Sequence, residues 1–149
     1  MNLPDYQTDK MDISKFKSIC ENEGIFFTIH LDENINICDF NKEVCNAYIK
    51  TILSTIEIAK ELKVPILNMH MGNGVYFTLP TEKVYLFKQY KEYYLLKLKS
   101  FRTLCEKAVG DSNIKICIEN SNGYRDFTME GIEVLLKSHI FGLTFDIGS

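Results

Sequence analysis

The sequence predicts an α/β fold in which about four parallel strands are covered by outer helices. Four short apolar runs recur along the chain, and stretches long enough for a helix separate them: 25–30, 64–70, 114–119 and 143–146. Parallel strands need such crossovers because the chain must return to the starting edge of the sheet before each new strand. By length, residues 1–149 make a single domain with room for a hydrophobic core.

Helical patterns occupy the intervals between these runs. A first helix is expected to begin near Asp12 and to end at Gly24, a residue suited to a left-handed C-terminal cap. A long helix follows, capped by Asp39 or Asn41. Further helices are expected over about 81–108 and 128–137. The resulting order is αβαβαβαβ, which predicts a mostly parallel sheet.

Each apolar run ends in a residue that can bind a metal, namely His30, His70, Glu119 or Asp146. Parallel strands place their C-terminal ends at one edge of the sheet, where α/β proteins carry their active sites. Two imidazoles and two carboxylates suit zinc, manganese or a similar divalent ion. We therefore predict that all four residues are metal ligands.

A structural role is the alternative for each ligand taken singly. Either histidine could be a hydrogen-bonded core residue, and Asp146 could cap a helix or form a turn. Glu119 follows Ile-Cys-Ile, where burial is costly for a carboxylate that is neither paired nor metal-bound. Four such residues at equivalent strand ends favour a site. His139 lies at an expected helix C-terminus, where the dipole favours histidine, and is interpreted as structural.

Composition excludes several classes of function. The net charge of −3 and the pI of about 5.6 argue against a nucleic-acid partner. No apolar run approaches the roughly 20 residues that span a bilayer, and the first ten residues lack signal-peptide features, so a cytoplasmic location is expected. The five cysteines form no C-x-x-C pair and are expected to be reduced. Neither a nucleotide phosphate loop nor a G-x-S-x-G motif is present.

The strand-end segments, in their order, resemble the xylose isomerase-like TIM barrels. These segments are Thr28-Ile29-His30-Leu31, Asn68-Met69-His70-Met71-Gly72, Ile116-Cys117-Ile118-Glu119-Asn120 and Leu143-Thr144-Phe145-Asp146-Ile147-Gly148. That superfamily contains sugar isomerases and epimerases as well as endonuclease IV-type enzymes (AP endonuclease family 2). The resemblance implies a partial (β/α) TIM-type barrel that corresponds to the second to fifth strands of the family fold.

The resemblance also implies roles for individual residues. In the isomerase branch, residues matching Glu119 and Asp146 bind a divalent metal, often manganese, that polarises oxygens of the sugar. In the endonuclease branch, residues matching His30, His70 and Glu119 hold one zinc ion, and Glu119 and Asp146 reach a second. Our first hypothesis is a metal-dependent isomerase or epimerase of a small sugar or sugar phosphate. Glu119 and His70 are its expected catalytic residues, and Asn36 and Asn120 its expected substrate-binding residues.

Two other hypotheses remain open. One is an endonuclease IV-like zinc phosphodiesterase acting on abasic DNA, and the other is a non-catalytic half-barrel that serves as an assembly module. The family's first strand, a later histidine and a terminal glutamate have no counterpart here, so we expect an incomplete barrel. Such a barrel leaves open edges and an uncovered inner face, which predicts a homo-oligomer. The sequence does not identify the substrate, because loops determine it in this fold.

Overall fold

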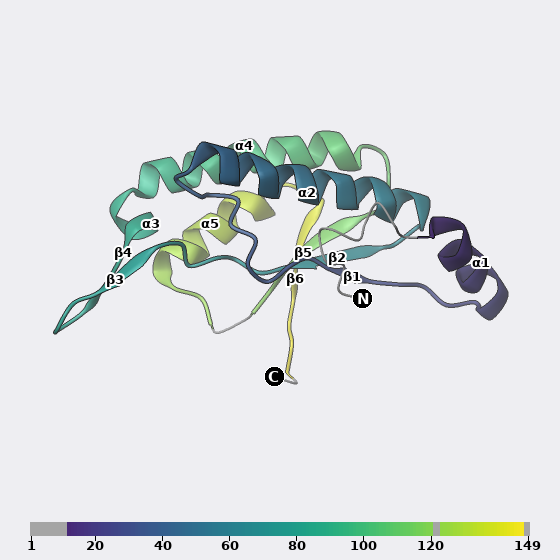
Figure 1. Cartoon of the computed structure of the whole chain (residues 1–149), viewed down its shortest axis with the longest axis horizontal. Helices are drawn as coiled ribbons and strands as arrows, with labels where there is room; N and C mark the ends of the chain where they lie inside the picture. The colour runs from purple at the N-terminus through teal and green to yellow at the C-terminus, as the bar shows by residue number, and fades with distance from the viewer. Residues whose placement is uncertain (1–11, 121–122, 148–149) are drawn as a thin grey trace.

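The computed structural model describes residues 12–120 and 123–147. A four-stranded parallel sheet forms its centre, with the strands in the order β1 (Ile29–His30), β2 (Ile66–Met69), β5 (Lys115–Glu119) and β6 (Phe141–Thr144). The crossovers contain α2 (Lys42–Glu61), α4 (Lys91–Val109) and α5 (Asp126–Leu136). Helices α2 and α4 lie side by side across one face of the sheet, and α5 packs against α4 (Figure 1). The predicted partial α/β barrel is therefore confirmed.

Local capping signals set the ends of the first two helices. Helix α1 (Ile13–Glu23) begins at Asp12, whose side chain accepts a hydrogen bond from the backbone N–H of Lys15, and it ends at Gly24 with φ of 63°. For α2, Asn41 rather than Asp39 is the N-cap, and its side chain accepts from the backbone N–H groups of Glu43 and Val44. A side-chain acceptor at this position satisfies N–H groups that have no partner inside the helix.

The first strand is shorter than the sequence predicts. The apolar run suggested a strand over 25–30 that is covered on both faces, whereas β1 contains only Ile29 and His30. Ile25 and Phe26 are 47% and 70% exposed. Strand β1 lies at the edge of the sheet and pairs with β2 alone, so only the two residues in register with β2 join the ladder.

The predicted helix over 81–108 is wrong at its beginning. An antiparallel hairpin of β3 (Tyr76–Thr78) and β4 (Lys83–Tyr85) comes first, followed by the short helix α3 (Leu86–Gln89) and then α4. Val84, which lies inside the expected helix, pairs instead with Phe77 in the hairpin. Aromatic and β-branched residues fit an exposed two-stranded ribbon as readily as a helix face, and their spacing does not distinguish the two.

Smaller boundary differences affect the last two elements. Helix α5 starts two residues before the expected position, at Asp126. Strand β6 runs from Phe141 to Thr144 instead of from 143 to 146, because Phe141 pairs with Ile116 and Thr144 with Glu119. Asp146 therefore follows the strand rather than ending it.

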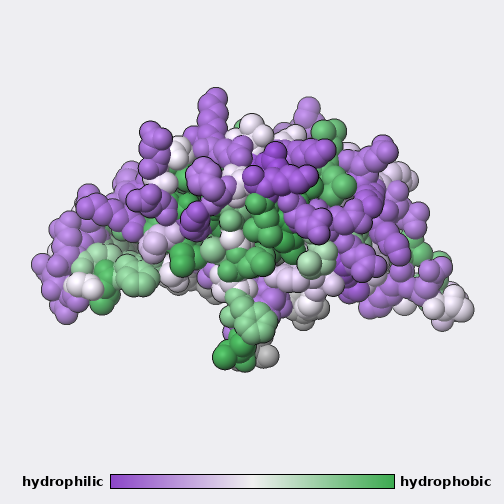
Figure 2. Space-filling view, turned by 180° about the vertical axis from the view of Figure 1, so that it is seen from behind, coloured by the Kyte–Doolittle hydropathy of each residue, from purple (hydrophilic) through white to green (hydrophobic). Residues whose placement is uncertain are grey.

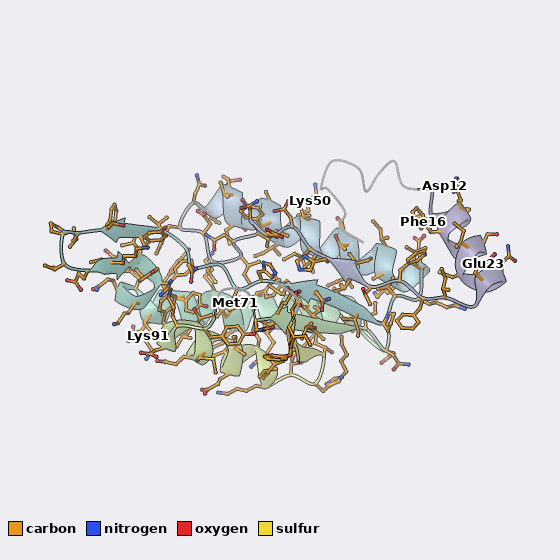
Figure 3. All side chains as sticks on the ribbon, turned by 90° about the horizontal axis from the view of Figure 1, so that it is seen from below. Asp12, Phe16, Glu23, Lys50, Met71 and Lys91 are labelled. Atoms are coloured by element: carbon orange, nitrogen blue, oxygen red, sulfur yellow. The ribbon has the colours of Figure 1, made fainter. Side chains whose placement is uncertain are left out.

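One face of the sheet is covered by helices, and we call the opposite face the inner face. The strand register shows which side chains point to each face. Ile29, Leu67 and Ile116 stand in register, are fully buried and point to the helices, where Leu98 and Phe101 of α4 complete the core. Side chains alternate along a strand, so His30, Asn68 and Glu119 point to the inner face. Figure 3 views the molecule from this side and shows Met71, just after β2, near its middle.

No helix in the described part of the chain is both long and apolar enough to cross a membrane. All five cysteines are free thiols, and all of them except Cys20 are buried.

Candidate metal site at the strand ends

Three of the four predicted ligands come together at the C-terminal edge of the sheet. His30 is the last residue of β1, Glu119 is the last residue of β5, and His70 follows β2 directly. Met69 pairs with Ile118, which places His70 beside Glu119 on the inner face. One ligand atom from each of these residues lies within 4.8 Å of the others. The predicted convergence of His30, His70 and Glu119 is confirmed.

The Glu119 carboxylate lies between the two imidazoles. Its Oε2 is 3.1 Å from His30 Nε2, and its Oε1 is 3.4 Å from His70 Nε2. The two rings meet edge to face, with centroids 4.8 Å apart and planes at 84°. The side chains of His30, His70 and Glu119 are 19%, 17% and 14% exposed. The group is thus shielded from bulk water but still reachable from it.

The backbone of the next residue fixes the tautomer of His30. His30 Nδ1 lies 2.6 Å from the carbonyl oxygen of Leu31, which can only accept a hydrogen bond, so the proton is on Nδ1. In neutral imidazole, Nε2 then carries a lone pair, and this lone pair faces a carboxylate oxygen of Glu119. Two acceptors at this distance repel each other. A cation between them removes the repulsion, whether it is a second proton on His30 or a metal ion.

These donors fit a divalent metal. Two imidazole nitrogens and one carboxylate oxygen are the ligands that zinc and similar ions take in sites that keep a position open for substrate or water. Metal-binding histidines usually donate their other N–H to a backbone carbonyl or a carboxylate, as His30 does to Leu31. The donor set and the second hydrogen bond of His30 agree with such a site.

Asp146 lies outside this group. It is exposed, and its backbone is held by the Asn120 side chain: Asn120 Nδ2 donates to the Asp146 carbonyl oxygen at 3.1 Å, and the Asp146 N–H donates to Asn120 Oδ1 at 2.6 Å. Asn120 thereby links the end of β5 to the segment after β6. The role of Asp146 as a metal ligand stays a prediction, as does a substrate contact by Asn120.

Asn36 borders the group on the side of His70. Both residues line a small cavity beside Gly72. Asn36 Nδ2 donates to Asp39 Oδ2 at 3.2 Å, and Asn36 Oδ1 accepts from the Cys38 N–H at 3.3 Å. These bonds order the loop after β1 next to His70. A substrate contact by Asn36 stays a prediction.

His139 lies at the other end of the sheet. It precedes β6, is exposed, and offers its backbone carbonyl oxygen to Lys115 Nζ. This position agrees with the structural role expected from the sequence.

Three polar residues near the metal group were not predicted from the sequence. Thr144 Oγ1 donates to Asn68 Oδ1 at 2.7 Å and so connects β6 to β2. Their signal was present, because Asn68 and Thr144 stand two residues before His70 and Asp146 and therefore share the face of a predicted ligand. Tyr124 is the third residue. Burial raises its pKa, and the negative charge of the Glu119 carboxylate raises it further.

Comparison with known proteins identifies the fold family. The profile of the xylose isomerase-like TIM barrel family matches residues 2–148. Among solved structures, a D-tagatose 3-epimerase-like protein is similar with a TM-score of 0.68 and 24% identity over 95% of this chain and 52% of its own. An L-ribulose 3-epimerase gives a TM-score of 0.69 and 15% identity, covering 93% of this chain and 47% of its own.

A Thermus thermophilus protein soaked with ZnCl2 gives a TM-score of 0.64 and 16% identity, covering 97% of this chain and 55% of its own. The chain thus spans about half the length of the solved structures it matches. No curated protein sequence matches it. The parallel sheet, its outer helices and the family profile agree, and the chain belongs to the xylose isomerase-like TIM barrel family.

Proposed function

We propose that the chain provides the metal site of a sugar isomerase or epimerase, with His30, His70 and Glu119 as ligands of a zinc or manganese ion. The observation that carries this proposal is the contact between His30 Nε2 and Glu119 Oε2 while His30 Nδ1 donates to Leu31. Resemblance to solved sugar epimerases supports the sugar as the class of substrate. We propose this function for a chain that is a single domain and spans about half the length of those two epimerase structures.

We assign each residue of the metal group a separate role. A bound divalent metal supplies Lewis-acid polarisation of the carbonyl and hydroxyl oxygens of a sugar. His30 is held rigidly by its bond to Leu31 and serves as a ligand. Glu119 would hold the metal between the two imidazoles. In the alternative role, its carboxylate would accept the proton from the sugar carbon next to the carbonyl. His70 supplies the second imidazole ligand through Nε2, the nitrogen that faces Glu119.

Three further residues are assigned by proposal. We assign Asn36, which lines a small cavity with His70, and Asn120, directly after β5, to the binding of sugar hydroxyl groups. Asp146 is proposed as an additional ligand that approaches once the segment after β6 rearranges.

Solvent exchange at the sugar carbon next to the carbonyl tests the function. Wild-type protein loaded with zinc or manganese is incubated in D2O with D-tagatose, L-ribulose, D-fructose or D-fructose 6-phosphate, and deuterium at C3 is followed by NMR. We expect exchange by wild type and by Glu133→Gln, an exposed site on α5. Glu119→Gln should lower the rate by about a hundredfold or more, because the amide is a poorer metal ligand than the carboxylate and cannot act as the base. Exchange that survives Glu119→Gln, or none with any of the sugars, contradicts the proposal.

A second candidate is phosphodiester hydrolysis at abasic sites in DNA. It is favoured by the presence of both histidines beside Glu119, the set that the endonuclease branch uses for zinc. The net charge of −3 opposes it, because phosphate contacts dominate DNA affinity. Nicking of an abasic duplex by the zinc-loaded protein, absent in Glu119→Gln, would favour this function over the isomerase.

We also propose that the chain self-associates. Leu143 in β6 is 57% exposed, and Phe145 and Ile147 in the segment after β6 are 78% and 87% exposed. Figure 2 shows apolar surface on the projection at the lower edge of the molecule, where Figure 1 places the C-terminal end. Contiguous apolar surface of this kind marks interaction sites in soluble proteins. A two-fold dimer that covers this projection is the simplest arrangement.

A further inference from the structure

A second concave site lies at the end of the molecule where the β3–β4 hairpin, α3 and the start of α5 meet (Figure 1). Its volume is about 360 Å³. That volume falls within the roughly 300–1,000 Å³ typical of small-molecule sites. Lys83 and Tyr85 of β4, Lys88 of α3, and Tyr124 and Arg125 before α5 line it. Segments distant in sequence thus build one pocket.

The pocket is positively charged, although the chain as a whole has a net charge of −3. Lys83, Lys88 and Arg125 contribute three cations, and Asp126 is the one carboxylate in the lining. Within residues 12–120 and 123–147, none of the three cations forms an ion pair with a carboxylate. By contrast, Lys91 of α4 is paired with Glu130. Unpaired cations in a concave surface favour an anion as the ligand.

Arg125 is already oriented for such a ligand. Its guanidinium lies 4.2 Å from the centre of the Tyr85 ring, and its Nε donates to Asn73 Oδ1 at 3.2 Å. Its terminal nitrogens make no hydrogen bond to the other described residues. A guanidinium held in this way presents paired N–H donors that match the oxygens of a phosphate group.

The N-terminus of α5 adds to the positive potential of the pocket. Arg125 is the N-cap residue of this 11-residue helix, and its side chain makes no capping hydrogen bond. Asp126 and Phe127 of the first turn also line the pocket. The first turn of a helix carries partial positive charge, which attracts anions and complements the three side-chain cations.

Two connections place the pocket next to the metal group. Tyr124 lines the pocket, and its pKa is raised by burial and by the Glu119 carboxylate. Asn73, which holds Arg125, follows His70 by three residues in the loop after β2. The loop after β2 therefore connects the proposed ligand His70 with Asn73, which accepts a hydrogen bond from Arg125 of the pocket.

We propose that Lys83, Lys88 and Arg125 bind the phosphate group of a sugar phosphate whose carbonyl end reaches His30, His70 and Glu119. This inference rests on the proposed isomerase function and narrows its substrates to phosphorylated sugars. The pocket supplies charge and N–H donors for the phosphate, and the metal group meets the uncharged end of the same molecule.

Inorganic phosphate is the first probe. It is titrated into the ¹⁵N-labelled chain at constant ionic strength, and backbone amide shifts are recorded. We expect saturable shifts at 83–88 and 124–127. Arg125→Gln and Lys88→Gln should each weaken binding by about tenfold, because each removes a charge-assisted contact. Lys137→Gln, at the opposite end of α5, is the matched control and should bind phosphate as wild type does. Amide shifts confined to other residues, or equal phosphate affinity in Arg125→Gln and Lys137→Gln, would overturn the proposal that this pocket binds phosphate.

A second comparison separates the pocket from the metal site. Zinc-loaded protein is titrated with D-fructose 6-phosphate and with inorganic phosphate. We expect tighter binding of the sugar phosphate, and loss of this difference in Glu119→Gln with phosphate affinity unchanged. Equal affinities in wild type would show a site for free anions only and overturn the substrate assignment. If zinc fails to bind while phosphate still binds at 83–88 and 124–127, the proposed metal-dependent function is wrong. The assignment of a sugar phosphate falls with it, and only a phosphate-binding pocket is shown.

Discussion

The carbonyl oxygen of Leu31 determines which nitrogen of His30 carries the proton. Because Nδ1 donates to that oxygen, Nε2 faces Glu119 Oε2 as an acceptor unless His30 is doubly protonated. One backbone contact therefore prepares an imidazole for metal binding and makes the metal-free site electrostatically unfavourable.

Replacing Glu119 with Gln tests the tautomer in metal-free protein. The Gln amide can donate to His30 Nε2, which turns a contact between two acceptors into a hydrogen bond. Glu119→Gln should therefore keep the free energy of unfolding or raise it by about 1 kcal/mol. Urea denaturation with chelator measures this, and Glu133→Gln on the exposed face of α5 should leave the midpoint unchanged. A lower midpoint for Glu119→Gln alone would mean that His30 is an imidazolium in a structural ion pair.

At the scale of elements, tight packing between α4 and α5 keeps the outer layer in place. A Cβ at Gly131 of α5 would lie 2.6 Å from Tyr94 Oη and 2.7 Å from Leu98 Cδ1. Tyr94 has little freedom to move, since its ring is buried and stacks on Phe87 at a centroid distance of 4.7 Å. Gly131 is thus required by the close approach of the two helices.

Gly131→Ala should destabilise the domain. Alanine improves helix propensity by about 1 kcal/mol, but overpacking a core typically costs about 1–3 kcal/mol. We expect a net loss of about 1 kcal/mol in the free energy of unfolding, measured by urea denaturation. Glu133→Ala changes an exposed position of the same helix and serves as the control for propensity alone. If Gly131→Ala has the same free energy of unfolding as wild type, or a higher one, then Tyr94 and Leu98 can shift to accommodate the methyl group without loss of stability.

Elements whose ends carry strong local signals could be predicted from the sequence. The caps at Asp12, Gly24 and Asn41 gave correct boundaries, and the apolar runs located the four strands of the main sheet. The β3–β4 hairpin could not be recognised, because Tyr76 and Phe77 are exposed and leave no alternation of burial. The same spacing of aromatic residues equally describes a helix face.

The positions of the residues at the strand ends predicted three members of the candidate site. The register of β6 explains why the fourth, Asp146, lies outside the group. His30, His70 and Glu119 were predictable because parallel strands end at one edge. Asp146 lies outside the group, and register gives the reason: β6 pairs through Thr144, which leaves Asp146 beyond the ladder. Register is a tertiary property that depends on the partner strand. Contacts such as Thr144 with Asn68, or Arg125 with Asn73, join segments that sequence spacing does not relate.

At the scale of the whole molecule, the main sheet has two edges, and the chain beyond one of them carries exposed apolar side chains. Phe145 and Ile147 follow the edge strand β6 and are 78% and 87% exposed. Burying such side chains gains about 1.5–3 kcal/mol each, which favours association of two chains. We expect the 17.3 kDa chain to sediment as a dimer at tens of micromolar.

Matched variants locate the interface of that dimer. Phe145→Glu should give a monomer, because a charge would have to be buried between the two chains. Phe77→Glu alters an equally large exposed ring on the hairpin and should remain dimeric. A monomeric wild type with cooperative thermal unfolding would rule out this assembly, and a dimer unaffected by Phe145→Glu would place the interface elsewhere.

The coordination of zinc in the protein tests the central claim most directly. X-ray absorption spectroscopy of the chain loaded with one equivalent of zinc distinguishes imidazole and carboxylate ligands, at about 2.0–2.2 Å, from thiolates at about 2.3 Å. We predict two imidazoles, oxygen ligands and no sulfur, with this signature lost in Glu119→Gln and kept in Glu133→Gln. Zinc bound through the sulfur of any of the five free cysteines, or an unchanged spectrum in Glu119→Gln, would contradict a metal site built from His30, His70 and Glu119.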